Sequence, residues 1–202
     1  SAVLEGNLTL PPEARGAVLF VHGSGSSRMS PRNRYVAQVL NRGNLGRLLF
    51  DLLTAEEEAV DMHTRELRFD VDFLARRVIG SIDWLLGHPA AAGLSIGLFG
   101  ASTGAAAALV AAAYRPDVIG AVVSRGGRPE LAGGTFEQVR APTLLIVGGL
   151  DMQVIALNEQ AYEQLYAERR LEIVAGATHL FEEPGALEEV AQLARKWFRK
   201  FL

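Results

Sequence analysis

The stretch Gly100-Ala101-Ser102-Thr103-Gly104 lies between a strand-like segment and a helix-like segment. The mostly apolar residues 94–99 lead into it, and an alanine-rich run over residues 105–113 follows it. A G-x-S-x-G pattern in this strand–turn–helix context is typical of a nucleophile elbow, in which a sharp turn exposes the serine hydroxyl. The two glycines let the strand and the helix approach each other closely. We therefore expect Ser102 to be a nucleophile, although the pattern by itself also fits a plain tight turn.

Two further candidate residues follow Ser102 in the chain, and each comes just after a strand-like run. Asp151 follows the apolar run 144–147, and His179 follows the run 171–174, each after a short loop. The carboxyl ends of parallel strands share one edge of a sheet, where functional groups collect. We therefore expect a triad in which His179 takes the Ser102 proton while Asp151 orients and stabilises the imidazole.

Two members of this triad also have a structural interpretation. Asp151 could cap a helix that begins at Met152, because aspartate is favoured at helix N-termini. His179 could be a solvated loop histidine. Glu182 and Glu183 are the nearest other carboxylates, but they follow His179 too closely in the chain to orient its ring easily.

An upstream loop supplies the last element that such chemistry needs. An apolar, strand-like run leads into residues 22–27, which read His-Gly-Ser-Gly-Ser-Ser. Small residues let the backbone approach a substrate carbonyl, and a His-Gly loop at this place holds an oxyanion donor. We expect the backbone N–H groups of Thr103 and Ser24 to form the oxyanion hole, with Gly25 as a less favoured substitute for Ser24. For His22 we favour a structural role beneath this loop over a role as a second base.

These segments, taken in order, resemble the α/β-hydrolase superfamily and, within it, the short dienelactone-hydrolase-like branch that lacks a cap. The resemblance covers residues 17–202. It implies an α/β-hydrolase fold and hydrolysis by a triad in the chain order Ser102, Asp151, His179. One departure is that dienelactone hydrolases proper use a cysteine nucleophile, whereas this chain has no cysteine. Ser102 therefore points to the serine esterase members and weakens the expectation of lactone specificity.

The hydrophobic pattern predicts a single domain over residues 1–202 with an α/β architecture. Most strand-like runs are continuous and apolar, which suits a parallel sheet covered on both faces. We expect strands over residues 8–10, 17–21, 48–52, 95–99, 118–124, 143–147 and 171–174, and helices over residues 31–42, 70–86, 103–114, 156–168 and 184–201. Pro31 and Pro184 fit the first turns of two helices. This alternation gives a doubly wound, mostly parallel sheet with helices on both faces, and the short interval 123–142 leaves no room for a separate cap domain.

Composition argues against several other classes of protein. The net charge of −3 and the lack of a basic cluster argue against nucleic-acid binding. The three glutamates at 56–58 fit a helix start better than a metal site. The first residues lack the pattern of a secretory signal, and the longest apolar run, 105–114, is too short to span a membrane. We expect a cytoplasmic protein that needs no membrane, metal or cofactor.

Several residues near the expected site are candidates for substrate binding. Arg28 and Arg125 could clamp an anionic group, because guanidinium pairs with carboxylate or phosphate through two hydrogen bonds. Salt bridges within loops explain either arginine equally well. Leu53, Leu150 and Met152 could line an acyl pocket, although core packing is the commoner fate of apolar residues.

The function that we expect is hydrolysis of small carboxylic esters or lactones through an acyl-enzyme on Ser102, by a monomer or homodimer. Thioester and amide hydrolysis use the same groups and stay open. A non-catalytic ligand-binding or interaction module with the same fold is the alternative from another class. A dinucleotide-binding protein is a weaker option, because the pattern that begins at Gly23 has Arg28 where the third glycine belongs.

Overall fold

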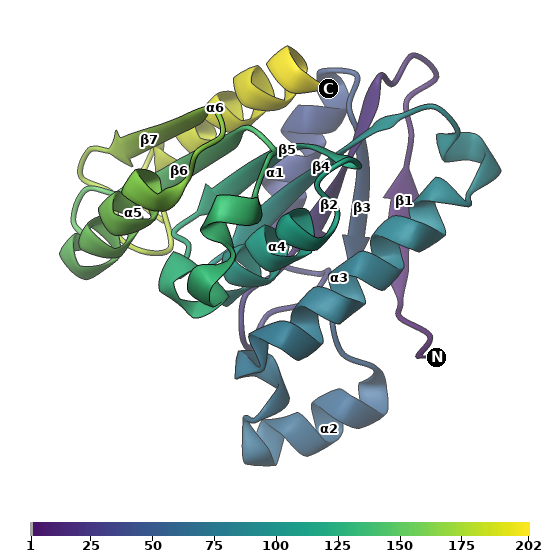
Figure 1. Cartoon of the computed structure of the whole chain (residues 1–202), viewed down its shortest axis with the longest axis horizontal. Coiled ribbons are helices and arrows are strands. Elements are labelled where there is room, and N and C mark those ends of the chain that lie inside the picture. The colour runs from purple at the N-terminus through teal and green to yellow at the C-terminus, as the bar shows by residue number, and fades with distance from the viewer. Residues whose placement is uncertain (1) are drawn as a thin grey trace.

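The computed structural model describes residues 2–202, so Ser1 lies outside the described residues. Over this range, seven strands form one sheet in the order β1-β3-β2-β4-β5-β6-β7 (Figure 1). β1 pairs with β3 in the antiparallel sense, and the other neighbouring strands are parallel. The strands are β1 Gly6–Thr9, β2 Gly16–Val21, β3 Gly46–Phe50, β4 Ser95–Ala101, β5 Ile119–Arg125, β6 Thr143–Gly148 and β7 Arg169–Val174.

Helices cover both faces of this sheet (Figure 1). One face carries α3 Val71–Leu86, α4 Thr103–Tyr114 and α5 Met152–Gln164, and the other carries α1 Pro31–Arg42 and α6 Ala186–Phe201. Every residue of β2 and β6 is buried between these two layers. This double burial explains why their sequences are continuous apolar runs rather than alternating ones.

The predicted fold class is confirmed, and each predicted strand has a counterpart in the sheet. Two helix starts were predicted wrongly. α5 begins at Met152 rather than at residue 156 and also ends earlier, at Gln164 rather than at residue 168, and α6 begins at Ala186 rather than at residue 184. Gly185 is the N-cap of α6 and has a φ of 83°, a left-handed conformation that separates Pro184 from the helix. Pro31, in contrast, does occupy the first position of α1.

A further helix, α2 Ala55–Thr64, was predicted only at its start. Thr54 and Glu57 form a reciprocal capping box there, in which each side chain accepts a hydrogen bond from the other residue's backbone N–H. The glutamates of residues 56–58 thus begin a helix, as expected. α2 follows β3 and continues into a short 3₁₀ turn, Leu67–Phe69, at the carboxyl edge of the sheet (Figure 1).

The interval that often holds a lid is short in this chain. Between β5 and β6 the backbone forms a 3₁₀ segment, Pro129–Gln138, which packs against α4 and α5. The remaining 3₁₀ turn spans Pro89–Ala91. None of the helices within residues 2–202 has the length and apolar character needed to cross a membrane.

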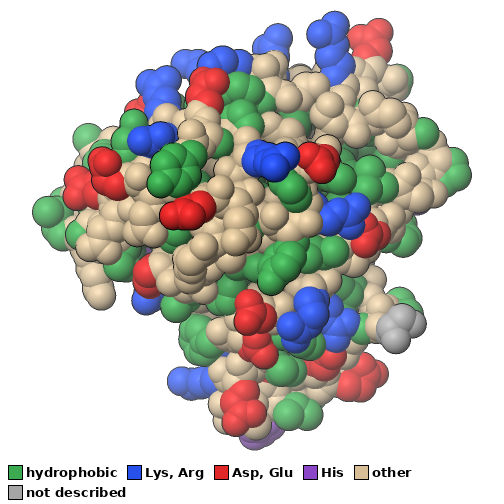
Figure 2. Space-filling model, in the orientation of Figure 1, with side chains coloured by type: hydrophobic (Ala, Val, Ile, Leu, Met, Phe, Trp, Pro, Cys, Tyr) green, Lys and Arg blue, Asp and Glu red, His purple; other side chains and the backbone are tan. Residues whose placement is uncertain are grey.

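Acidic and basic side chains are mixed over the molecular face drawn in Figure 2. Opposite charges also pair between neighbouring elements of the molecule, as Arg77 of α3 does with Glu57 of α2 and as Arg115 does with Asp83. Because opposite charges lie close together, this face carries no extended region of a single sign.

Candidate active site

Ser102 occupies a strained turn between β4 and α4. Its φ of 51° and ψ of −122° are rare for a residue with a side chain, and such strain is found at the serine of a nucleophile elbow. Both flanking glycines are required by packing. A Cβ on Gly100 would lie 2.4 Å from Ala105 Cα, and one on Gly104 would lie 2.3 Å from the Val21 carbonyl oxygen. The sequence therefore folds into a turn that only small residues allow.

Asp151 and His179 meet beyond the ends of β6 and β7. Asp151 Oδ2 lies 2.6 Å from His179 Nδ1. Asp151 occupies the N-cap position of α5 but makes no side-chain cap hydrogen bond, so its carboxylate orients the imidazole rather than the helix. Glu182 pairs with an arginine of α1, and Glu183 accepts a hydrogen bond from the Thr178 hydroxyl. The structure thus gives His179 the carboxylate partner that the sequence predicted.

His179 and Ser102 both lie beside the end of β5. The Ser102 N–H donates to the Arg125 carbonyl at 3.1 Å. The next residue, Gly126, lies under the His179 ring, since a Cβ built on Gly126 would be 3.5 Å from His179 Nδ1. Within residues 2–202 no hydrogen bond joins Ser102 Oγ to His179. Such bonds often tighten only when substrate is bound.

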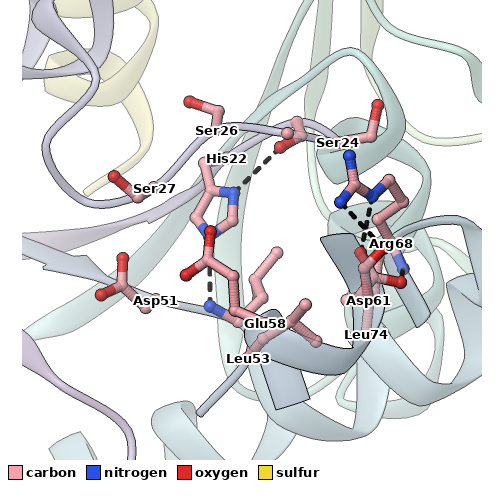
Figure 3. A pocket seen from close by; sticks show the side chains of 13 residues that line it. His22, Ser24, Ser26, Ser27, Asp51, Leu53, Glu58, Asp61, Arg68 and Leu74 are labelled. Carbon is pink, nitrogen blue, oxygen red and sulfur yellow. Dashed lines mark hydrogen bonds and ion pairs between the residues drawn. The ribbon is translucent and has the colours of Figure 1, made fainter. Parts of the chain in front are cut away.

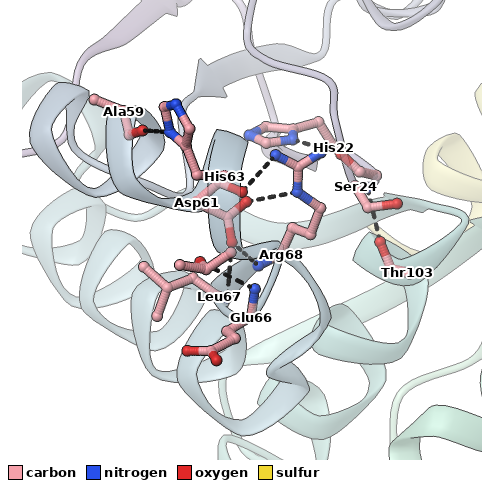
Figure 4. Close-up of polar contacts among 11 residues, drawn as sticks. His22, Ser24, Ala59, Asp61, His63, Glu66, Leu67, Arg68 and Thr103 are labelled. Carbon is pink, nitrogen blue, oxygen red and sulfur yellow. Dashed lines mark hydrogen bonds and ion pairs between the residues drawn. The ribbon is translucent and has the colours of Figure 1, made fainter.

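The loop after β2 packs directly on the Ser102 turn. A Cβ on Gly23 would lie 3.2 Å from Ser102 Cβ. The Ser24 N–H donates to Thr103 Oγ1 at 2.8 Å (Figure 4). Ser24 and Thr103 thus lie in contact, but the Ser24 N–H, the expected oxyanion donor, is engaged by the Thr103 hydroxyl. Gly25 lies near Arg68, since a Cβ on Gly25 would be 3.6 Å from Arg68 Nη1.

His22 supports this loop from below. Its Nδ1 lies 3.0 Å from the Gly23 carbonyl oxygen, and its Nε2 accepts a hydrogen bond from the Leu52 N–H at 3.1 Å (Figure 3). Burial lowers the pKa of His22 below its ordinary value of 6.5. A neutral ring with its proton on Nδ1 satisfies both contacts. Both ring nitrogens are therefore used, which agrees with a structural role and leaves none free for a second base.

A small cavity lies beside this histidine, and no pattern in the sequence indicated it. It has a volume of about 30 Å³, is lined by His22, Asp51 and Glu58 among others, and has room for about one water molecule (Figure 3). Next to it, the buried Asp61 accepts hydrogen bonds from the backbone N–H and the guanidinium of Arg68 (Figure 4). Burial opposes ionisation of Asp61, but the hydrogen bonds from Arg68 prevail and lower its pKa. This pair joins the end of α2 to the 3₁₀ turn that follows it.

The two candidate arginines differ in their surroundings. Arg28 pairs with both Asp51 and Glu5, so its charge is already balanced and its predicted role in an anion clamp is not supported. Arg125 is 7% exposed, so its guanidinium lies inside the protein and not on the rim of the cleft. Its Nη1 has no hydrogen-bond partner. Burial and the nearby charge of Arg32 lower the pKa of Arg125 to about 10.

Comparison with known proteins decides the family. Residues 36–202 match the dienelactone hydrolase family. The chain belongs to the dienelactone hydrolase family. It is 61% identical to the dienelactone hydrolase from Anabaena variabilis, with a TM-score of 0.97 over 98% of this chain and 92% of that one. Est1E from Butyrivibrio proteoclasticus shares the fold, with a TM-score of 0.81, 16% identity, and coverage of 98% of this chain and 93% of that one.

Two longer relatives carry a different name. Proteins called "Putative phosphoribosyl transferase" in two Mycobacterium tuberculosis strains are 56% identical to this chain over 193 residues. The match covers 96% of this chain but 43% of each of those proteins. This dienelactone hydrolase family member thus spans less than half the length of these curated relatives.

Several apolar residues adjoin the candidate site residues of this family member in the chain. Leu150 and Met152 flank Asp151 and are 63% and 69% exposed, so they are not core residues. Leu180 follows His179 and is also exposed, whereas Leu53 is half-buried near the His22 cavity. Exposed apolar side chains are therefore the chain neighbours of both Asp151 and His179. Within residues 2–202 no group of three or more His, Cys, Asp or Glu side chains is arranged to hold a metal ion.

Proposed function

We propose that this dienelactone hydrolase family member is a serine hydrolase that cleaves small carboxylic esters or lactones through an acyl-enzyme on Ser102. The hydrogen bond between Asp151 and His179, made beside the strained Ser102 turn, is the observation that carries this proposal. A serine hydroxyl is a weak nucleophile unless a base removes its proton. The sequence brings a serine, a base and a carboxylate to one edge of the sheet, where that activation can occur.

The proposed reaction has two steps. His179 takes the Ser102 proton as the hydroxyl attacks the ester carbonyl, and it then gives that proton to the leaving alcohol. Asp151 holds the His179 Nδ1–H and stabilises the imidazolium that forms. Water then attacks the acyl-enzyme with His179 again as the base, which releases the acid and restores Ser102. The Thr103 N–H belongs to the first residue of α4, where a backbone amide has no helix partner, and we expect it to donate to the oxyanion.

The surroundings favour small and accessible esters. The short segment between β5 and β6 leaves the site without an inserted lid, and the exposed Leu150, Met152 and Leu180 offer an apolar surface for an acyl or alcohol group. Arg125 is the remaining candidate for an anionic group of the substrate, but only for a group that enters the protein far enough to meet its buried Nη1, which lacks a partner. We do not extend phosphoribosyl transfer to this chain, since more than half of each relative with that name lies outside the match.

Thioester and amide hydrolysis would use the same groups, and a non-catalytic ligand-binding module remains the alternative from another class. Covalent labelling with a fluorophosphonate probe, followed by intact mass and peptide mapping, separates an enzyme from such a module. We expect one adduct per chain on Ser102, its loss in Ser102→Ala, and a much slower reaction in His179→Ala. Folded protein that takes up no probe would reject the activated serine and favour the binding module, in which Ser102→Ala leaves ligand affinity unchanged.

A further inference from the structure

The Thr103 side chain has a contact that the proposed reaction does not use. Thr103 is the first residue of α4 and is 3% exposed. Its Oγ1 accepts a hydrogen bond from the Ser24 N–H at 2.8 Å, across 79 positions of the chain (Figure 4). A hydroxyl that accepts one hydrogen bond still has its own proton to donate. No hydrogen bond donated by this hydroxyl is found within residues 2–202.

The position of this hydroxyl relates it to the oxyanion. Thr103 directly follows Ser102, and its backbone N–H is free of helix partners because it is the first in α4. Ser24 is exposed and follows Gly23, which packs on Ser102. In this architecture the oxyanion lies between the amide after the nucleophile and an amide of the upstream loop. Thr103 Oγ1 lies within hydrogen-bond distance of the Ser24 amide, which is the expected second donor.

We infer that the Thr103 hydroxyl is itself a donor of the oxyanion hole, with the Ser24 N–H holding it in place. During attack, the Thr103 N–H and the Thr103 O–H both donate to the negative oxygen of the tetrahedral intermediate. The Ser24 N–H stays on Thr103 Oγ1, where it increases the polarity of the O–H bond. No proton leaves the hydroxyl, so the interaction is purely electrostatic. This inference rests on the proposed function, because it needs an acyl transfer at Ser102.

Two other roles for the same contact make different predictions. If Thr103 Oγ1 only blocks the Ser24 N–H, removal of the hydroxyl frees a donor and activity is kept or increased. If the contact only joins the loop to α4, its removal lowers stability and leaves the rate per folded molecule unchanged. The donor role alone lowers the rate of the chemical step while the protein stays folded.

The test uses Thr103→Val, which keeps the shape of the side chain and removes the hydroxyl, and Thr103→Ser, which keeps the hydroxyl. Thr143→Val is the matched control, because Thr143 is also buried and its hydroxyl donates to the Ala141 carbonyl at the other end of β6. With p-nitrophenyl acetate we expect Thr103→Val to lower kcat by about 10²- to 10³-fold with little change in KM. Thr103→Ser should retain most of the wild-type kcat, and Thr143→Val should lower Tm and leave kcat unchanged.

A second measurement tests the binding of the oxyanion directly. A trifluoromethyl ketone forms a hemiketal oxyanion on an activated serine, so its affinity should fall in Thr103→Val by a factor similar to the fall in kcat. Unchanged or increased kcat in Thr103→Val, or a Thr103→Ser variant as slow as Thr103→Val, would overturn the inference. Failure of the proposed function looks different, because wild-type protein would then show neither turnover nor fluorophosphonate labelling.

Discussion

At the scale of single residues, Asp151 contributes to the proposed reaction only through His179. Asp151→Asn keeps the size of the side chain and removes the charge that fixes the imidazole tautomer. We therefore expect kcat for p-nitrophenyl acetate to fall by about 10⁴-fold, as measured at saturating substrate, with an unchanged circular dichroism spectrum. Glu182→Gln is the control, since Glu182 is three residues from His179 yet pairs with Arg32. It should retain nearly full activity, and equal losses in both variants would contradict a specific role for Asp151.

A second residue, Arg125, concerns whether the substrate carries an anionic group. Arg125→Met fills a similar volume and removes a buried charge that lacks a partner at Nη1. We expect KM for an ester that carries a carboxylate to rise by about 10- to 100-fold, because a hydrogen bond to a charged group contributes about 1.5–3 kcal/mol. KM for a neutral ester of the same size should not change. Arg28→Gln serves as the comparison, because Arg28 is already paired with Asp51 and Glu5. Equal effects of Arg125→Met on both esters would exclude a binding site for an anion.

Some of these residues were predictable from the sequence and others were not. Ser102, Asp151 and His179 each follow a strand of a parallel sheet, so the fold alone brings them to one edge. The bond from Ser24 to the Thr103 hydroxyl depends on a side-chain rotamer, and no local pattern encodes it. Arg28 likewise pairs with Glu5, 23 positions before it, and with Asp51, 23 positions after it. Spacing in the sequence does not predict contacts between residues so far apart.

At the scale of elements, the elbow joins three segments that leave no room for a side chain. Gly104→Ala would place its Cβ 2.3 Å from the backbone oxygens of Val21 and His22. Because both are backbone atoms, the end of β2 or the loop after it would have to move to relieve this clash. We expect a loss of about 1–3 kcal/mol in the free energy of unfolding, measured by urea denaturation, and slower labelling of Ser102. Gly80→Ala in α3 is the control, because no atom lies within 4 Å of its Cβ position. It should stabilise the protein by about 0.5–1 kcal/mol, and equal destabilisation by both changes would argue against crowding at the elbow.

Element boundaries were less predictable than the elements themselves. The predicted range 156–168 misses the first turn of α5, although that turn holds Met152, Val154 and Ile155. The alternative interpretation of Asp151 as a helix cap indicated the correct start, because Asp151 does occupy the N-cap position. Its carboxylate makes no cap hydrogen bond and contacts His179 instead, so the residue type marked the boundary while its side chain serves the site.

At the scale of the whole molecule, the apolar runs predicted a parallel sheet because both faces of the strands are buried. The hydrophobic periodicity of the sequence does not predict the order of the strands in the sheet. β2 lies between β3 and β4, which places the loop after β2 beside the elbow after β4. β1 lies at the edge of the sheet and pairs with β3 in the antiparallel sense. No distinct pattern in the sequence predicts this direction.

His22 connects these parts of the sheet, and its protonation should affect the stability of the whole fold. The ring joins the end of β2 to Leu52, just beyond β3. Burial lowers the pKa of His22, although its hydrogen bond to Gly23 and the charges of Asp51 and Glu58 oppose this effect. The unfolded chain therefore binds a proton at this residue near pH 6.5, while the folded chain does not. The stabilisation is fully present above pH 6.5 and is lost as the pH falls below that value.

We expect the free energy of unfolding, from urea titrations, to decrease between pH 7.5 and pH 5.5 in the wild type. His22→Gln keeps an acceptor for the Leu52 N–H and removes the titrating group. It should be less stable than the wild type by about 1 kcal/mol at pH 7.5 and should lose less stability on acidification. The lowered pKa of Asp61 acts at a lower pH, because its ordinary value is 3.8, so it does not affect this interval. An equal pH dependence in both proteins would show that protonation of His22 does not cause the loss of stability between pH 7.5 and pH 5.5.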